Sequence, residues 1–409
     1  MSRSVPLPKP SNLARHWSLD PNIVYLNHGS FGACPTRVLE AQQQWRQRME
    51  AEPVQFFARD LEGLLDGARR ELAGYLGCSA DGLVFVPNAT AGVNAVVRSM
   101  EFSPGDELLT TNHEYNACNN VLRHVASKTG ARIVEAEVPF PCSGPDVVLE
   151  HICAAVSPRT KLALISHITS QSAMIFPIKN IVRLLESKGV PVLVDGAHAP
   201  GMVDLNISDI GAAFYTGNCH KWMCAPKGAG FLHVRKDWRE RIVPASVSHG
   251  LNSQRTDRSK FLLLFDWTGT ADPTAYLCVP EALRVMQSLA PGGWPKIRRH
   301  NHELVLAGRR TLCTALGIEP PAPESMIGSI ASVPLPDSSG PAPTSALYAD
   351  PLQDELKARF GIQIPIIPWP AHPKRVMRLS AQLYNTNAHY TWLASSLLQI
   401  LSSSTTTAR

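Results

Sequence analysis

A lysine held between two turns is the residue best placed for covalent chemistry in this chain of 409 residues. Lys221 follows a small polar turn and precedes a loop broken by Gly and Pro, after which Phe231–Val234 predicts a strand. A lysine amine can form a Schiff base with an aldehyde cofactor when burial or nearby positive charge lowers its pKa. Most single lysines are only solvated surface residues, so other residues must decide between the two interpretations.

An aspartate 26 residues before Lys221 favours the chemical interpretation. Val192–Val194 predicts a buried strand, and Asp195 stands at its end. Ligands bind at the carboxyl ends of the strands of an open parallel sheet, where Asp195 is expected to lie. An acid beside a pyridine nitrogen keeps that nitrogen protonated, as pyridoxal 5'-phosphate (PLP) requires in order to accept electrons. The pair therefore indicates a PLP site in which Lys221 carries the Schiff base.

The turn before a predicted helix is a candidate phosphate site. Leu83–Val86 predicts a strand, residues 87–94 contain a small polar turn, and the residues to about Met100 predict a helix. Free backbone N–H groups and the helix dipole hold phosphate in such an arrangement. The glycine patterns of nucleotide sites are missing, so a nucleotide is not indicated. Asn88 or Thr90 could equally serve only as the helix N-cap, and the two interpretations stay open.

The alternation of predicted strands and helices from about residue 83 to 200 indicates an α/β fold with a parallel sheet. Polar turns that would meet at one edge of this sheet follow its strands at residues 87–94, 111–116, 169–172 and 195–201. The domain organisation that we expect is an N-terminal arm over residues 1–24, a large domain over 25–273, a small domain over 274–401 and a disordered polar tail over 402–409.

The composition argues against several classes of protein. The net charge of +5 comes from scattered Lys and Arg, so nucleic acid is not an expected partner. No apolar run is long enough to span a membrane, and no apolar signal core is visible. The 9 cysteines form no paired motif, which fits reduced thiols in a cytoplasm. Cys219, His220 and Cys224 lack a second ligand pair at zinc spacing, so we expect a cytoplasmic protein without a metal site.

Several motifs are specific in combination: Tyr25–Gly32, Asn88–Thr90, His113–Asn116, Asp195–Gly201, His220–Lys221 and Arg378–Ser380. In this order and spacing they resemble the class V aminotransferase family of fold-type I PLP enzymes, and within it the isopenicillin N epimerase-like branch. The resemblance covers roughly residues 22–390. It implies PLP as cofactor, a mostly parallel sheet of the seven-stranded type in a large PLP-binding domain, and a smaller α+β C-terminal domain.

The resemblance also implies which residues contact the cofactor. Lys221 would carry the Schiff base, and Asp195 would pair with the pyridinium nitrogen. His113 matches the ring-stacking position, with Tyr115 in the same turn as the alternative. The other implied contacts are Ser170 and His198 at the ring hydroxyl, Ala89, Thr90, Asn218 and His220 at the phosphate, and, from a second subunit, Thr268 and Thr270. These last two imply a homodimer.

On the substrate side, the resemblance implies an amino acid whose α-carboxylate Arg378 clamps bidentately, a geometry that suits guanidinium. Asn27 and His28 would line the substrate entrance. Lys221 would then remove the Cα proton as general base. The candidates for an acid on the opposite face are His28, His113 and Tyr115.

The same first step serves several reactions. Return of the proton to the opposite face gives epimerisation, which the resemblance favours. Loss of a β-leaving group gives C–S lyase action on a cysteine conjugate or sulfoxide, and transamination is a third outcome. Cysteine desulfurases need a nucleophilic Cys in the C-terminal third, but the last one here is Cys313, on a predicted helix, which disfavours that activity. The alternative from another class is a catalytically silent PLP-binding protein. The presence of Lys221, Asp195 and Arg378 together argues against it, because such a protein has no need to keep all three.

Overall fold

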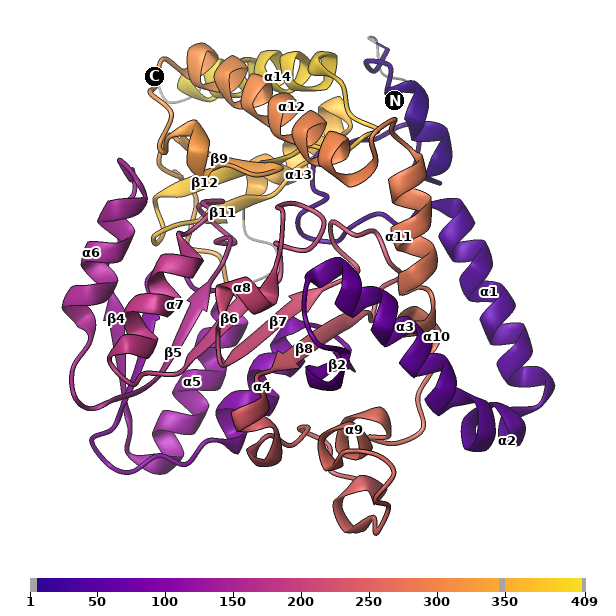
Figure 1. Cartoon of the computed structure of the whole chain (residues 1–409). Helices are drawn as coiled ribbons and strands as arrows, with labels where there is room; N and C mark the ends of the chain where they lie inside the picture. The colour runs from indigo at the N-terminus through magenta and orange to yellow at the C-terminus, as the bar shows by residue number, and fades with distance from the viewer. Residues whose placement is uncertain (1–5, 346–349, 407–409) are drawn as a thin grey trace.

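A seven-stranded sheet forms the centre of the molecule (Figure 1). The computed structural model describes residues 6–345 and 350–406. The order of the strands across the sheet is β2 (Leu83–Val86), β8 (Gly230–Val234), β7 (Phe214–Asn218), β6 (Val192–Gly196), β5 (Thr160–Ser166), β3 (Glu107–Thr111) and β4 (Arg132–Ala136). β8 pairs antiparallel with β2 and β7, and the other pairings in this sheet are parallel. The predicted α/β class with a mostly parallel sheet is therefore confirmed.

Helices bury both faces of this sheet, as its nearly continuous apolar strands require. Successive side chains point to opposite faces, so in β5 Leu162 and Leu164 join one apolar core while Ala163 and Ile165 join the other. The first core includes α4 (Ala89–Ser99), α5 (Asn116–Thr129) and α9 (Lys260–Asp266). The second core includes α3 (Leu61–Leu76), α6 (Pro145–Ala155), α7 (Ile178–Ser187) and α8 (Ile207–Ile210). The two cores fix the strand ends, and with them the turns that follow.

The C-terminal region contains a smaller sheet beside two long helices (Figure 1). The antiparallel strands of this sheet are, in spatial order, β11 (Ile366–Pro368), β12 (Arg375–Ser380) and β9 (Ile330–Leu335). The helices of the region are α12 (Gly293–Leu316), α13 (Pro351–Phe360) and α14 (Asn387–Thr406). Leu393, Leu397 and Ile400 of α14 are buried in the core. The helix continues through residues 402–406, where the sequence predicted a disordered tail, and residues 407–409 lie outside the described residues.

The N-terminal segment joins this C-terminal region. β1 (Val24–Tyr25) pairs parallel with β10 (Ile362–Gln363), and the amide of Gly29 donates a 3.1 Å hydrogen bond to Ser380 Oγ. The remaining α-helices are α1 (Thr36–Ala51), α2 (Pro53–Gln55), α10 (Thr274–Leu277) and α11 (Val279–Ser288). Shorter helical turns are η1 (Asn12–His16), η2 (Phe56–Asp60), η3 (Ala80–Gly82), η4 (Lys236–Arg241), η5 (His249–Asn252) and η6 (Glu324–Met326). Over residues 6–345 and 350–406, no helix has both the length and the apolar character needed to cross a membrane.

Candidate active site

A cavity of about 390 Å³ opens where the polar turns after several strands meet. Its walls include nine residues predicted from the sequence: Ala89, Thr90, Tyr115, Ser170, Asp195, His198, Asn218, His220 and Lys221. Ser30, Phe31, Asn88, Ser166, Ile168 and Ala197 complete them. The structure thus brings together residues that lie far apart in the sequence, as parallel strands ending at one edge require.

Lys221 lies just beyond the end of β7, and its amine is buried in this cavity. Burial and the positive charge of Arg378 lower the pKa of Lys221 to about 8. Its Nζ lies 3.2 Å from His198 Nε2, and Trp222 Nε1 lies 3.3 Å from His198 Nδ1. Burial holds the pKa of His198 well below its ordinary value, so the ring is neutral. Because the indole N–H only donates, His198 Nδ1 is the acceptor and Nε2 carries the ring proton. Nε2–H can therefore donate to the Lys221 amine in its uncharged, nucleophilic form, which the lowered pKa makes accessible near neutral pH.

Two glycines let neighbouring loops approach the backbone around Lys221. A Cβ atom on Gly32 would lie 2.5 Å from the carbonyl oxygens of His220 and Lys221. Gly201 has a φ of +86°, and a Cβ there would lie 2.5 Å from the carbonyl carbon of Trp222. Side chains at either position would displace the lysine loop, which explains the glycines of both motifs.

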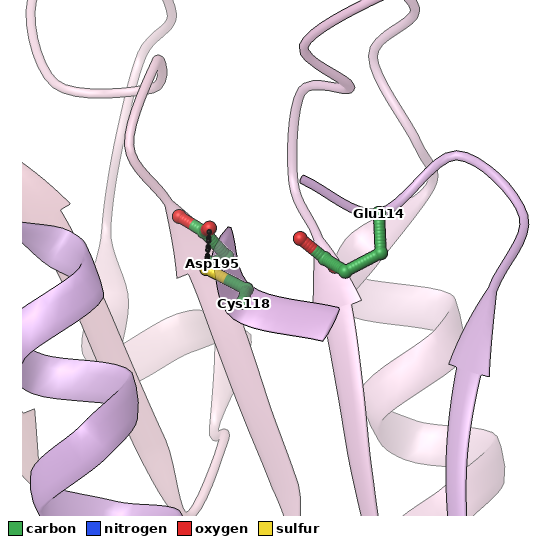
Figure 2. A group of neighbouring side chains, drawn as sticks. All are labelled: Glu114, Cys118 and Asp195. Carbon is green, nitrogen blue, oxygen red and sulfur yellow. Dashed lines mark hydrogen bonds between the residues drawn. The ribbon is translucent and has the colours of Figure 1, made fainter. Parts of the chain in front are cut away.

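Asp195, at the end of β6, is buried on the wall of the cavity. Its Oδ1 accepts a 2.9 Å hydrogen bond from the amide of Ala197, and its Oδ2 accepts one of 3.2 Å from the thiol of Cys118 (Figure 2). Glu114 lies beside this pair, and its Oε1 accepts hydrogen bonds from the Tyr115 amide at 2.8 Å and from Ser166 Oγ at 2.9 Å. The sequence analysis missed Glu114 and Cys118, although both flank the predicted Tyr115.

The first turn of α4 shows that the two interpretations of this turn are compatible. Asn88 is the N-cap, since its Oδ1 accepts a 2.9 Å hydrogen bond from the amide of Ala91. Asn218 Oδ1 accepts a 2.8 Å hydrogen bond from the amide of Ala89. Thr90 also lines the cavity, at the positive end of the helix dipole. An anion such as phosphate therefore fits at this end of the cavity.

Arg378 of β12 is a buried cation held by neutral groups. Its Nη1 donates to the backbone oxygen and to Oγ of Ser170, at 2.7 and 3.1 Å, and its Nη2 donates to Ser30 Oγ at 2.6 Å. Burial lowers the pKa of Arg378 to about 10. Its Nε is buried and has no hydrogen-bond partner among the described residues. Because an uncompensated buried charge is costly, this guanidinium is suited to an incoming carboxylate beside the cavity.

His28 lies behind the lysine and outside the cavity lining. The sequence predicted that it lines the substrate entrance. Its Nε2 donates to the Lys221 carbonyl oxygen at 3.1 Å, and its Nδ1 accepts from the Tyr384 hydroxyl at 2.8 Å. Burial lowers the pKa of His28 to about 3, so the ring is a neutral support for the lysine loop. The neighbouring Asn27 also lies outside the lining, with its Oδ1 buried and unpartnered among the described residues. The entrance role of Asn27 and His28 therefore stays a prediction, and the structure gives His28 a second role as a support for the lysine loop.

His113 also lies outside the cavity lining, in contrast to the predicted stacking position. Its Nε2 donates to the Val138 carbonyl oxygen at 2.9 Å, its Nδ1 accepts from Ser172 Oγ at 2.6 Å, and its ring packs 4.6 Å from that of Trp369. Tyr115, the alternative in the same turn, lines the cavity and is 40% exposed. Of the two rings in this turn, Tyr115 is the one that lines the cavity, and the choice of the cofactor-facing ring stays a prediction.

The Thr268–Thr270 turn does not reach this cavity within one chain. Thr268 and Gly269 line a neighbouring hollow with Trp267, and this hollow also includes Pro87 and Ala91 at the start of α4. The contribution of Thr268 and Thr270 to the phosphate therefore remains a prediction that depends on a second subunit.

Comparisons with known proteins agree with this geometry. The Aminotransferase class-V family model matches residues 24–347. The chain is 33% identical over 404 residues to an isopenicillin N epimerase of Amycolatopsis lactamdurans, covering 95% of this chain and 98% of that protein. It is 29% identical over 399 residues to a probable chloroplastic L-cysteine desulfhydrase of Arabidopsis thaliana, covering 91% and 81% of the two chains.

A solved structure of C-DES with glycine covalently linked to its PLP cofactor has the same fold. It superposes with a TM-score of 0.77 at 20% identity, over 92% of this chain and 96% of that one. The site described above fits PLP, because one cavity presents a lysine amine of lowered pKa, a buried carboxylate and the N-terminus of α4. The chain therefore belongs to the class V aminotransferase family, and it is an enzyme whose cofactor is PLP.

Proposed function

We propose that this enzyme epimerises an amino-acid substrate at its α-carbon, as an isopenicillin N epimerase-like enzyme. The relatives at 33% and 32% identity over nearly the whole chain support this activity. The observation that carries the proposal is that Lys221 and Tyr115 line one cavity. An epimerase needs one group to remove the Cα proton and another to return a proton from the opposite side.

In this proposal Lys221 and Asp195 hold PLP at its aldehyde and its ring nitrogen, and His198 and Ser170 lie at the ring hydroxyl. Bound PLP supplies an electron sink for the charge left at Cα. Arg378 binds the substrate carboxylate from beside the cavity, held in place by Ser170 and Ser30. Lys221 takes the Cα proton as general base.

The returning proton comes from Tyr115. Of the three candidate acids, His28 and His113 lie outside the cavity lining with both ring nitrogens hydrogen-bonded, and Tyr115 lies on it. Burial raises the pKa of Tyr115, so its phenol carries a proton at neutral pH. The amide of Tyr115 is fixed by Glu114, which anchors the ring at its base.

We expect Tyr115→Phe to lower the rate of formation of the inverted product by about 10²–10⁴-fold, the range for loss of a general acid. The measurement is NMR and chiral chromatography of the substrate after incubation in D₂O. Because Lys221 is intact, the starting enantiomer should still exchange its α-proton for deuterium. Tyr75→Phe, on α3 against Trp294, is the matched control. Undiminished inversion in Tyr115→Phe would remove Tyr115 from this role.

A β-eliminating C–S lyase is the second candidate, supported by the desulfhydrase relatives. It shares the removal of the Cα proton but releases ammonia, a keto acid and a sulfur leaving group, which is sulfide from cysteine, a thiol from a conjugate or a sulfenic acid from a sulfoxide. The same assay therefore separates the two, with transamination recognised by a keto acid without a sulfur leaving group. Cysteine desulfuration has little support, because none of the 9 cysteines, all within the described residues, lines the cavity. A silent PLP-binding protein would give neither product nor exchange.

The oligomeric state and the cellular location also belong to the proposal. The enzyme acts as a homodimer in which Thr268 and Thr270 of a second subunit reach the phosphate, and it resides in the cytoplasm. The exposed Val247 and Leu251 and the hollow at Thr268 offer a surface for a second copy. All cysteines are free, which suits a reducing compartment. Cell fractionation checks whether the protein resides in the cytoplasm.

We expect Thr90→Ala and Thr268→Ala each to raise the PLP dissociation constant about tenfold, as loss of one hydrogen bond to a charged group predicts. Equilibrium dialysis of PLP against the apoenzyme measures the constant, and sedimentation velocity at the same concentrations measures the oligomeric state. The two variants differ in one respect. The effect of Thr268→Ala requires the dimer, whereas that of Thr90→Ala does not. An unchanged constant for Thr268→Ala in a dimeric protein would exclude the second subunit from the phosphate site.

A further inference from the structure

Glu114, Cys118 and Asp195 form a buried cluster of side chains (Figure 2). One ligand atom from each residue lies within 4.8 Å of the others, and the three side chains come from the turn after β3, from α5 and from β6. Asp195 also lines the cavity, so the cluster connects the protein interior to the site. In the proposed function Glu114 only anchors the backbone of Tyr115, and Cys118 has no role.

The Cys118 thiol is a hydrogen-bond donor to Asp195. Burial and the two neighbouring carboxyl groups raise the pKa of Cys118 well above its ordinary value, so the sulfur keeps its proton. The 3.2 Å contact from Sγ to Oδ2 is then an S–H donor on an oxygen that accepts. The amide of Ala197 holds the other oxygen, Oδ1, at 2.9 Å. Both oxygens are anchored, which fixes the plane of the carboxylate.

The negative charge of the cluster resides on Asp195. Two carboxyl groups this close in a buried place do not both ionise readily. Burial and the charge of Asp195 raise the pKa of Glu114 to about 8, so Glu114 is neutral at pH 7. Its buried Oε2 has no partner in the described chain. Burial also raises the pKa of Asp195, but hydrogen bonds from Ala197 and Cys118 and the charge of Lys221 oppose that rise.

We propose that Cys118 is a positioning residue for Asp195: its thiol orients the carboxylate and stabilises its charge, so that Asp195 meets the ring nitrogen of PLP as an anion while Glu114 stays neutral. The physical basis is that a donor to a carboxylate favours its charged form. An anionic Asp195 keeps the ring nitrogen protonated, and the electron sink depends on that proton. The inference rests on PLP as the cofactor and holds for epimerase, lyase or transaminase alike.

The test compares Cys118→Ala with Cys118→Ser, because serine keeps a donor where alanine removes it. We expect the PLP dissociation constant of Cys118→Ala to rise about tenfold, the effect of one hydrogen bond to a charged group. NMR of PLP labelled with ¹⁵N at the ring nitrogen should show a smaller protonated fraction in Cys118→Ala. Cys118→Ser should restore both quantities toward wild type, although serine is smaller than cysteine.

A matched control separates this role from packing. Cys313→Ala removes another buried thiol, in α12, and should leave the ring-nitrogen signal unchanged. Equal behaviour of Cys118→Ala and Cys118→Ser, or an unchanged nitrogen signal in Cys118→Ala, would overturn the inference. So would stoichiometric zinc in the wild-type protein that is lost in Cys118→Ala, since the cluster would then be a metal site. None of these outcomes depends on the reaction catalysed, so failure of the epimerase proposal is seen separately in the product assay.

Discussion

Lys221→Ala is expected to lower turnover by at least about 10²–10⁴-fold, the contribution of a positioned general base, with further loss from the missing covalent attachment. The lysine is suited to this double role because burial and Arg378 lower the pKa of its amine to about 8, which increases the uncharged, nucleophilic form near neutral pH, and His198 Nε2 lies 3.2 Å from its Nζ. The assay is Cα–H exchange in D₂O together with the visible absorption of PLP bound to the purified protein.

Lys221→Arg is the informative control, since it keeps a positive charge but offers no amine of lowered pKa. It should be as inactive as Lys221→Ala. Small alkylamines added to Lys221→Ala should partly restore exchange, whereas damage to the fold would not respond to them. Exchange at the wild-type rate in either variant would show that Lys221 is not the base.

The second large effect is expected for Arg378→Lys, with kcat/KM about 10²–10³-fold lower because one partner of a buried charge pair no longer fits a planar carboxylate. The visible absorption of bound PLP should remain, since Arg378 contacts Ser30 and Ser170 at the side of the cavity. Steady-state kinetics with an amino acid and with its carboxamide give the measurement.

The carboxamide identifies the group that Arg378 recognises. If the carboxylate is that group, wild type should lose most of its kcat/KM on the carboxamide, and Arg378→Lys should lose little more. Arg375→Lys is the matched control, on the same strand but paired with Asp350 at 2.8 Å. An equal loss on both substrates would mean that Arg378 only supports the fold.

Much of the fold was predictable because its signals are local. The apolar runs at Leu83–Val86 and Val192–Val194 are buried strands, and the alternation with helices indicated a parallel sheet. Such a sheet brings its strand ends to one edge, so Asp195 and Lys221 could be placed together without knowing any contact. The tail prediction failed over residues 402–406, since a polar sequence can continue a helix whose earlier turns are packed.

Details of the site depended on contacts that no local pattern contains. His113 and Tyr115 share one turn, and contacts with Val138 and Trp369 hold the histidine ring outside the cavity lining, which no local pattern predicts. His28 lies behind Lys221 because Tyr384, 356 positions away, binds its ring. The thiol of Cys118 acquires its role only through Asp195, 77 positions later. Arg378 was identified by family resemblance, and not by any feature of its own strand.

The link between Ser30 and Arg378, which spans 348 positions, also sets an order of assembly during protein synthesis. Along the chain, β8 is the last strand of the seven-stranded sheet. Domains generally fold as their chain emerges from the ribosome. Arg378 emerges about 160 residues after Lys221, at a synthesis rate of roughly 5–20 residues per second. For about 8–30 s, therefore, a nascent chain contains the residues of the cavity but lacks Arg378, to which Ser30 of the cavity wall is bonded in the finished fold. In the proposed mechanism, the residue that binds the substrate is therefore made well after the residues that hold the cofactor.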